Sequence, residues 1–262
     1  LNNIRKIYKL LKVVMNKNLN QLKTLVNKNV FIPTGTSDLL IEVASKIIKP
    51  NKKILDLGCG NGIVGISLSK LQSNNTKIYF SDISIPAYKN TEANCKKFKV
   101  NYEIKLGKVF SAWKNYKFDY IVSDIAAIAD KVAKISPWYK NCVNNAGADG
   151  TKNVIEFLNN ANSYLNSNGV ILFPVISLSR EKKIISILKK KFKKIKLVKS
   201  KLWPLPKSMY KNINTLNYLK KKKIIFFENK YDIITFRTDI YYAQKKTNKS
   251  DNKIIENISK IL

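Results

Sequence analysis

Short apolar runs alternate along the chain with longer segments in which apolar residues recur every three or four positions. The short runs predict β-strands at 53–57, 77–81, 102–106, 118–123, 170–176 and 195–202. The three-to-four spacing predicts helices at 39–47, 62–71, 85–98, 154–165 and 181–192. Strands that alternate with helices of this length form parallel, doubly wound sheets with right-handed crossovers. We therefore predict an α/β fold.

The two ends of the chain follow other patterns. Residues 1–29 carry apolar positions at helical spacing and predict a basic amphipathic arm, which either packs on the main domain or contacts a substrate. Residues 223–227 and 233–242 are rich in strand-forming residues and predict a hairpin around 228–232. One hairpin strand would be the last, antiparallel strand of a mostly parallel, seven-stranded sheet. We divide the chain into a helical arm (1–29), a main domain (30–243) and a lysine-rich tail (244–262).

The main domain contains a glycine-rich segment, ILDLGCGNGIVGI, at residues 54–66. Asp56 lies near the tip of the first strand, Gly58, Gly60 and Gly62 form a turn, and a helix follows. Glycines allow backbone N–H groups to approach a ligand closely, and a helix N-terminus favours negative charge. Asp82 ends the second strand, 20 residues after Gly62. A carboxylate at that offset can accept hydrogen bonds from both ribose hydroxyls of a nucleotide-like cofactor.

The order D-x-G-x-G-x-G resembles the first motif of the class I S-adenosylmethionine-dependent methyltransferases. It differs from the dinucleotide-binding G-x-G-x-x-G pattern, because Ile63 stands three residues after Gly60. The resemblance implies a Rossmann-like methyltransferase fold with S-adenosylmethionine as the cofactor. The residues that it implies bind the cofactor are Asp56, Gly58, Cys59, Gly60, Gly62, Asp82, Ile83 and Val109.

Across residues 30 to 180 the chain is similar to the small-domain branch of that family, and most of all to the release-factor glutamine methyltransferases. Gly147-Ala148-Asp149-Gly150 and the helix-and-strand pattern after it run parallel to a segment of that group. Two positions depart from the group. Ser123-Asp124-Ile125-Ala126-Ala127 replaces its Asn-Pro-Pro-Tyr signature, and Lys108 replaces the acidic residue that receives the adenine amino group. Lysine has no hydrogen-bond acceptor. Either the adenine is recognised in another way, for example by the backbone at Val109, or this part of the site is weakened.

Asp124 is the candidate catalytic residue. Its carboxylate either orients the acceptor group and takes its proton, or caps the fourth strand beside the cofactor. Trp138, Tyr139 and Trp203 follow strands whose carboxyl ends form the ligand-binding edge of such a sheet. These rings either stack on a planar substrate or pack as part of a lid.

Composition limits the chemistry further. The 262 residues, 45% of them hydrophobic, suit one large α/β domain. The chain has no histidine, which removes histidine-based catalysis and the usual zinc sites. Three widely spaced cysteines, Cys59, Cys95 and Cys142, suggest reduced thiols, and we expect no metal site.

The net charge is +32, from 49 basic and 17 acidic residues. Such a charge is compatible with nucleic acid as a partner. Only three basic residues are arginine, and the abundance of Lys, Asn and Ile is also what an AT-rich genome produces. No apolar run approaches the roughly 20 residues of a membrane span, and no signal-like segment follows the basic N-terminus. We therefore expect a cytoplasmic monomer without a membrane partner.

Two functions remain open at this point. The first is methyl transfer from S-adenosylmethionine to an unidentified acceptor in a protein, an RNA or a small molecule. The second is a non-catalytic protein that keeps the fold to bind RNA or a partner protein.

Overall fold

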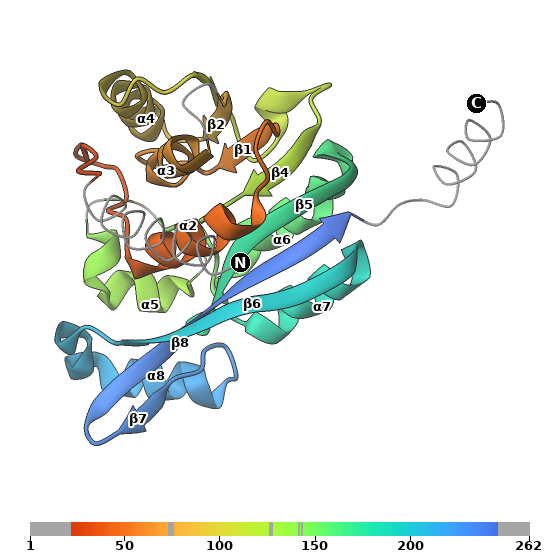
Figure 1. Ribbon diagram of the computed structural model, residues 1–262. Coiled ribbons are helices and arrows are strands. Elements are labelled where there is room, and N and C mark those ends of the chain that lie inside the picture. Colours follow the sequence, from red (N-terminus) through yellow and green to blue (C-terminus); the bar gives the residue numbers. More distant parts are fainter. Residues whose placement is uncertain (1–21, 73–75, 126–127, 141, 143, 246–262) are drawn as a thin grey trace, which may run out of the picture.

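The computed structural model describes residues 22–72, 76–125, 128–140, 142 and 144–245 (Figure 1). Its strands are β1 (Ile54–Leu57), β2 (Ile78–Asp82), β3 (Tyr102–Leu106), β4 (Phe118–Val122), β5 (Leu165–Ile176), β6 (Phe192–Pro204), β7 (Glu228–Lys230) and β8 (Ile233–Lys245). Its α-helices are α2 (Gly35–Ile47), α3 (Ile63–Gln72), α4 (Ile85–Lys97), α5 (Asp130–Ile135), α6 (Lys152–Ala161), α7 (Glu181–Lys191) and α8 (Ile213–Lys221). Single turns of 3₁₀-helix are η1 (Ser111–Trp113), η2 (Pro137–Tyr139), η3 (Asn162–Tyr164) and the longer η4 (Lys207–Asn212).

The described strands form one eight-stranded sheet in the order β3-β2-β1-β4-β5-β8-β6, with β7 paired to β8. Neighbours from β3 to β5 are parallel, whereas β8 is antiparallel to both β5 and β6. This arrangement confirms the predicted α/β fold, with its mostly parallel sheet and late antiparallel strand. The sheet has an eighth strand because β7 extends the hairpin beyond the seven strands of the main path.

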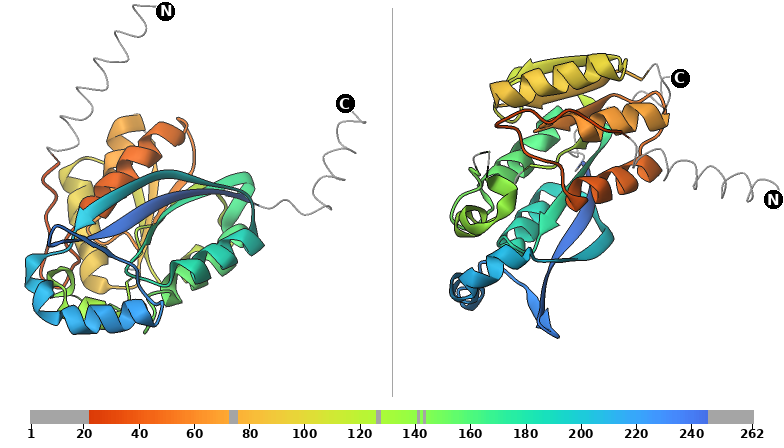
Figure 2. Two further views of the ribbon diagram at one scale, coloured as in Figure 1. Left: turned by 90° about the horizontal axis from the view of Figure 1, so that it is seen from below. Right: turned by 90° about the vertical axis from the view of Figure 1, so that its left-hand side faces the viewer.

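Helices cover both faces of the sheet, as the views in Figure 2 show. One face packs against α2, α3 and α4 through apolar side chains such as Leu40, Ile66 and Phe80. The other face packs against α6 and α7, with Phe157 and Phe173 in its core. The central strands β1 and β4 contribute buried apolar residues to both cores, as expected of strands covered on both faces.

A third apolar cluster lies where α5, η4, α8 and the start of β8 meet. It contains Val132 of α5, Met209 of η4, Leu216 of α8 and Phe236 of β8. The loop after β5 joins this layer, because Phe226 N–H donates to the Ser177 carbonyl at 2.6 Å. The third cluster therefore builds a wall beyond the carboxyl end of β5.

Several segments differ from the sequence-based expectations, and helices α5 and α8 were not predicted. The first strand of the hairpin is at 228–230 and not at 223–227, because Ile225 and Phe227 are buried in the third cluster. The helix expected at 154–165 begins at Lys152 and ends at Ala161. Residues 22–29 contain no helix, and the rest of the expected helical arm (1–21) and most of the expected tail (246–262) lie outside the described residues. No helix within the described ranges has the length and apolarity needed to cross a membrane.

Candidate active site

The glycine turn after β1 is fastened to the end of β2. The backbone N–H groups of Gly58 and Cys59 donate to the Ser81 carbonyl at 2.8 and 3.1 Å. Gly58, Gly60 and Gly62 have φ values of +72°, +58° and +82°, in the left-handed region that favours glycine. The sequence motif thus folds as a strand, a tight turn and the start of α3, as the spacing predicts.

The glycines of this turn have different surroundings. A Cβ at Gly60 would meet no atom within 4 Å, whereas a Cβ at Gly62 would lie 2.9 Å from the Thr91 methyl group of α4. Gly60 and Gly58 line a cavity of about 700 Å³, together with the backbone of Cys59. The Cys59 thiol itself contacts Thr91 Oγ1 at 3.3 Å. Gly62 and the Cys59 side chain therefore hold the turn against α4, and Gly58 and Gly60 border open space.

Asp56 lies in the same cavity and organises the start of α3. The carboxylate is buried, and its Oδ2 accepts a hydrogen bond from Gly65 N–H at 2.8 Å. Its pKa is raised to about 7, mainly by burial. The hydrogen bond from Gly65 opposes this rise, and the carboxylates of Asp124 and Asp82 contribute to it. The two carboxylates that act on Asp56 are the other acidic residues of this cavity.

Asp82 connects the glycine turn to the start of α4. Its Oδ2 accepts from Gly60 N–H and its Oδ1 accepts from Ser84 N–H, both at 2.9 Å. Burial raises its pKa, while the backbone N–H groups of Ser84 and Gly60 act in the opposite direction. Each carboxylate oxygen keeps a second lone pair. Asp82 can therefore still accept hydrogen bonds from a ligand in the cavity.

Asp124 follows β4 on the opposite side of the cavity. Its Oδ2 accepts a hydrogen bond of 2.6 Å from Ser37 Oγ, in the first turn of α2. Burial raises the pKa of Asp124, and the hydrogen bond from Ser37 opposes that rise. Burial also raises the pKa of Tyr139, and the Asp124 carboxylate raises it further. Asp124 thus lines the cavity and is held by the first turn of α2.

The segment before α2 closes this cavity. Asn29, Val30, Phe31 and Pro33 line it, and sequence reasoning did not select them. The segment is held by α4, because Asn94 Oδ1 accepts from Leu25 N–H at 2.8 Å and Asn94 Nδ2 donates to the Leu25 carbonyl at 2.9 Å. Two asparagines at helical spacing, Asn90 and Asn94, are a sequence signal that could have indicated such an attachment.

The far end of the cavity holds the remaining predicted residues. Ile83 is 65% exposed beside Asp82, and Val109 has a φ of +47°, which is strained for a β-branched residue. Such strain is concentrated at ligand sites. Lys108 Nζ forms an ion pair of 2.8 Å with Glu156 of α6. Asn153, in the first turn of α6, lines the same cavity and carries the amide acceptor that Lys108 lacks.

The structure thus brings most of the predicted site residues to one cavity. The predicted residues that line it are Asp56, Gly58, Cys59, Gly60, Asp82, Ile83, Val109 and Asp124. Within the described part of the chain, no three His, Cys, Asp or Glu residues are grouped as metal ligands.

Comparison with known proteins identifies this arrangement. Residues 13–126 match the methyltransferase small domain family. A release factor glutamine methyltransferase from Dictyoglomus turgidum is 32% identical over 139 residues, which cover 48% of this chain and 49% of that protein. A tRNA1(Val) (adenine(37)-N6)-methyltransferase from Actinobacillus pleuropneumoniae is 30% identical over 128 residues, which cover 48% of this chain and 52% of that protein. The chain spans about half the length of the curated relatives that it matches.

A solved structure extends the likeness to nearly the whole chain. The methyltransferase from Pyrococcus furiosus superposes with a TM-score of 0.53 at 14% identity, and the match covers 94% of this chain and 100% of that one. At this identity the likeness concerns the fold alone. Residues 13–126 thus match a methyltransferase small domain, and the described chain has a fold similar to that of this solved methyltransferase.

Proposed function

We propose that the protein transfers a methyl group from S-adenosylmethionine to an acceptor that is bound beside Asp124. The observation that carries the proposal is the cavity with three carboxylates, the buried Asp56 and the half-buried Asp82 and Asp124, in a chain of net charge +32. Burying three acidic groups raises all three pKa values and is costly without a partner. A ligand with cationic groups and hydroxyl donors offsets that cost, and S-adenosylmethionine carries a sulfonium, an ammonium and a ribose.

The cavity residues fit this cofactor. Asp82 would accept from the ribose hydroxyls, and the turn at Gly58 and Gly60 would approach the methionine portion. Ile83 would cover the adenine ring, and Asn153 and the backbone at Val109 would supply its polar contacts. Asp56 would hold the turn through Gly65 and act on the ammonium by its charge.

The cofactor when bound supplies an electrophilic methyl group on a sulfonium that is already a good leaving group. The protein then acts mainly by position. Ser37 fixes one oxygen of Asp124 and leaves the other to orient the acceptor and to take up its proton. Since burial raises the pKa of Asp124, its carboxylate is a stronger base than an exposed one.

The acceptor lies in a protein or an RNA under this proposal, as the names of the relatives suggest. A non-catalytic protein with the same fold is the competing function, because Lys108 and the sequence after β4 depart from the release-factor group. The monomeric state and the cytoplasmic location expected from the sequence stay predictions.

Titration calorimetry with S-adenosylmethionine separates these functions at the first step. We expect binding to the full chain, and no binding of ATP, because the triphosphate would meet three carboxylates. Asp82→Ala should weaken cofactor binding at least tenfold, since a hydrogen bond to a charged group contributes about 1.5–3 kcal/mol.

The matched control for that variant is Asp119→Ala. Asp119 also accepts from a backbone N–H, that of Lys53, and from Asn166 Nδ2, but it does not line the cavity. We expect the control to lower Tm and to keep the affinity for S-adenosylmethionine. If the folded wild-type chain does not bind the cofactor, the proposed activity is wrong.

A further inference from the structure

A second cavity adjoins the carboxylate cavity and shares two of its walls. The smaller cavity has a volume of about 240 Å³, and Phe31 and Tyr139 line both cavities. The ring centroids of Phe31 and Tyr139 are 5.2 Å apart. The first turn of α2 also borders both, because Thr34 and Thr36 line the smaller cavity while Ser37 bonds to Asp124. A group in the smaller cavity therefore lies next to the site of transfer.

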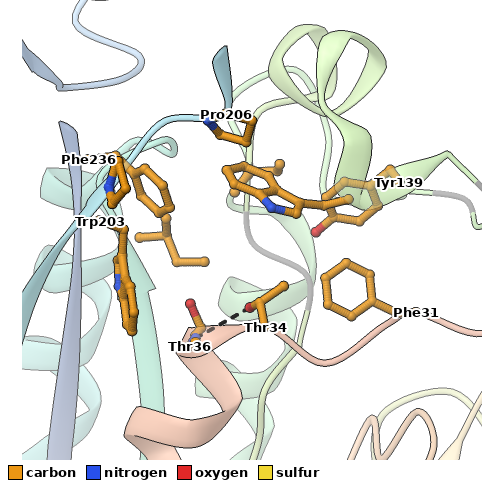
Figure 3. A pocket seen from close by; sticks show the side chains of 12 residues that line it. Phe31, Thr34, Thr36, Tyr139, Trp203, Pro206 and Phe236 are labelled. Carbon is orange, nitrogen blue, oxygen red and sulfur yellow. Dashed lines mark hydrogen bonds between the residues drawn. The ribbon is translucent and has the colours of Figure 1, made fainter. Parts of the chain in front are cut away.

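The smaller cavity is walled by aromatic rings. Figure 3 shows Trp203 and Phe236 on one side, Tyr139 and Phe31 on the other, and Thr34 and Thr36 between them. Trp138 completes the lining and packs edge-on against Phe236, with centroids 5.4 Å apart. The rings come from the segment before α2 and from η2, β6 and β8, which are distant in the sequence. Trp138, Tyr139 and Trp203, which the sequence indicated as stacking or lid residues, thus line one cavity.

Size and polarity restrict what fits there. Pockets that enclose a whole drug-sized ligand measure roughly 300–1,000 Å³, so this cavity suits a single planar ring system. The lining offers ring faces and two threonine hydroxyls. The indole N–H of Trp203 is buried and has no hydrogen-bond partner among the residues that the structure describes. A planar heterocycle can stack on these ring faces, with the threonine hydroxyls beside it.

Exposed lysines surround this cavity. Lys201 Nζ lies 4.1 Å from the centroid of the Trp203 ring. Lys140 and Lys207 are exposed and directly follow the lining residues Tyr139 and Pro206. Aromatic rings that stack bases beside cations that attract phosphates are the usual basis of single-strand binding. A primary amide of a protein side chain would leave polar atoms against ring faces and would not need the lysines.

We infer that the aromatic cavity binds an unpaired nucleobase of a single-stranded RNA, whose phosphates contact the surrounding lysines. This inference rests on the proposed function, because it names the acceptor that would react beside Asp124. It assigns the stacking role to rings outside residues 123–127, the segment that directly follows β4. These rings are Phe31, Trp138, Tyr139 and Trp203.

The test measures RNA binding without cofactor, by the fluorescence anisotropy of a labelled single-stranded RNA of mixed sequence. A second RNA has the same length but one abasic position, and further probes are the matched DNA and a glutamine-containing peptide. We expect the intact RNA to bind about 5- to 150-fold more tightly than the abasic RNA, the range that one stacked base contributes. Trp138→Ala and Trp203→Ala should remove this preference, and Trp203→Phe should restore part of it.

Two controls keep the result specific. Tyr231→Ala removes an aromatic ring that is 97% exposed on the β7–β8 turn, and it should not change binding. The salt dependence of binding should be the same in wild type and Trp138→Ala, because no charge is removed.

Several results would overturn the inference. Equal affinity for intact and abasic RNA would leave only backbone contacts, and equal or tighter binding of the DNA would exclude RNA as the specific ligand. Tighter binding of the peptide would assign the cavity to a protein acceptor. Calorimetry with S-adenosylmethionine on the same preparations shows separately whether the proposed activity itself fails.

Discussion

The buried side chain of Asp56 makes the stability of the fold depend on pH. Its folded-state pKa is about 7, raised by burial, whereas an unfolded aspartate titrates near 3.9. Between these values the folded protein holds a proton that the unfolded chain has lost. The contribution of Asp56 to stability is therefore complete below about pH 4 and is lost as pH rises to about 7.

Replacing Asp56 with asparagine should remove that dependence. The amide oxygen can still accept from Gly65 N–H, so the turn is kept. We expect the free energy of unfolding of Asp56→Asn, relative to wild type, to increase with pH between about 4 and 7, by at most about 1.4 kcal/mol per pH unit. Urea unfolding of the cofactor-free protein at several pH values measures this difference.

Asp149→Asn is a control variant for which we expect the opposite pH dependence of stability. Burial acts to raise the pKa of Asp149, but hydrogen bonds from Thr151 and Lys183 outweigh burial and lower that pKa. The stability contributed by Asp149 is thus present above the unfolded pKa and is lost as pH falls. Asp149→Asn should lose stability relative to wild type as pH rises, and a common slope for both variants would contradict the assignment.

Asp124 is the residue on which catalysis depends in our proposal. Asp124→Asn keeps an acceptor for Ser37 Oγ but cannot take up a proton. We expect methyl transfer to fall by about 10²- to 10⁴-fold, as for loss of a general base, with cofactor affinity changed less than about tenfold. Single-turnover transfer of labelled methyl to the acceptor gives the rate, and calorimetry gives the affinity. A loss confined to cofactor affinity would make Asp124 a cofactor contact.

At the scale of elements, the segment before α2 depends on α4. Asn94 Nδ2 donates to both the Leu25 and Asn61 carbonyls, and Asn90 Oδ1 accepts from Asn27 N–H at 2.7 Å. Both asparagines are fully buried. One helix face thereby holds the glycine turn and the segment that carries Phe31 to both cavities.

Asn94→Ala should release that segment. Its loss removes the partner of the Leu25 N–H and of the Asn61 carbonyl, which destabilises the fold by about 1–3 kcal/mol, while Asn90 still bonds to the Leu25 carbonyl. We expect faster hydrogen exchange at residues 24–31 and weaker binding in both cavities. Asn166→Ala, which removes a hydrogen bond to Asp119 away from the cavity, should leave exchange in this segment unchanged. Unaltered exchange in Asn94→Ala would show that the segment is held by other contacts.

The elements that the sequence predicted well are those with local signals. Strands β1 to β4 are apolar runs that end at a polar or glycine residue, and the glycine turn needs positive φ at fixed positions. Helix α8 was not predicted, although Ile213, Leu216 and Leu219 recur every three residues; it has only nine residues, and its burial depends on the third cluster. The insertion of β8 between β5 and β6 arises from long-range pairing, which has no local sequence signal.

The same distinction applies to the site. Asp56, Gly60, Asp82 and Asp124 follow strands whose carboxyl ends meet at one edge, so their proximity follows from the predicted topology. Phe31 and Ser37 reach that edge through contacts with α4 and Asp124. Trp203 packs directly on Gly35, where an added Cβ would lie 2.4 Å from the indole. The spacing of residues along the sequence does not predict this long-range contact.

At the scale of the whole molecule, an acidic cavity lies within a strongly basic chain. The 49 basic residues exceed the 17 acidic ones, and several acidic residues are already used in the cavity. The remaining cations repel one another when they are close, and this repulsion destabilises the compact state. Salt shortens its range, since the Debye length falls from about 30 Å at 0.01 M to about 10 Å at 0.1 M.

Stability should therefore increase with ionic strength. We expect the Tm of the full chain to rise between about 0.01 and 0.1 M NaCl, because screening weakens repulsion among exposed lysines more than it weakens the few exposed ion pairs. Binding of S-adenosylmethionine should change little over the same range, since its site is buried, whereas RNA binding should weaken steeply. Differential scanning fluorimetry and the two binding assays measure the three quantities on one preparation. A Tm that falls with added salt would show that attractive ion pairs outweigh the repulsion. Cofactor affinity that falls with salt as steeply as RNA affinity would place the cofactor on the basic surface and not in the carboxylate cavity.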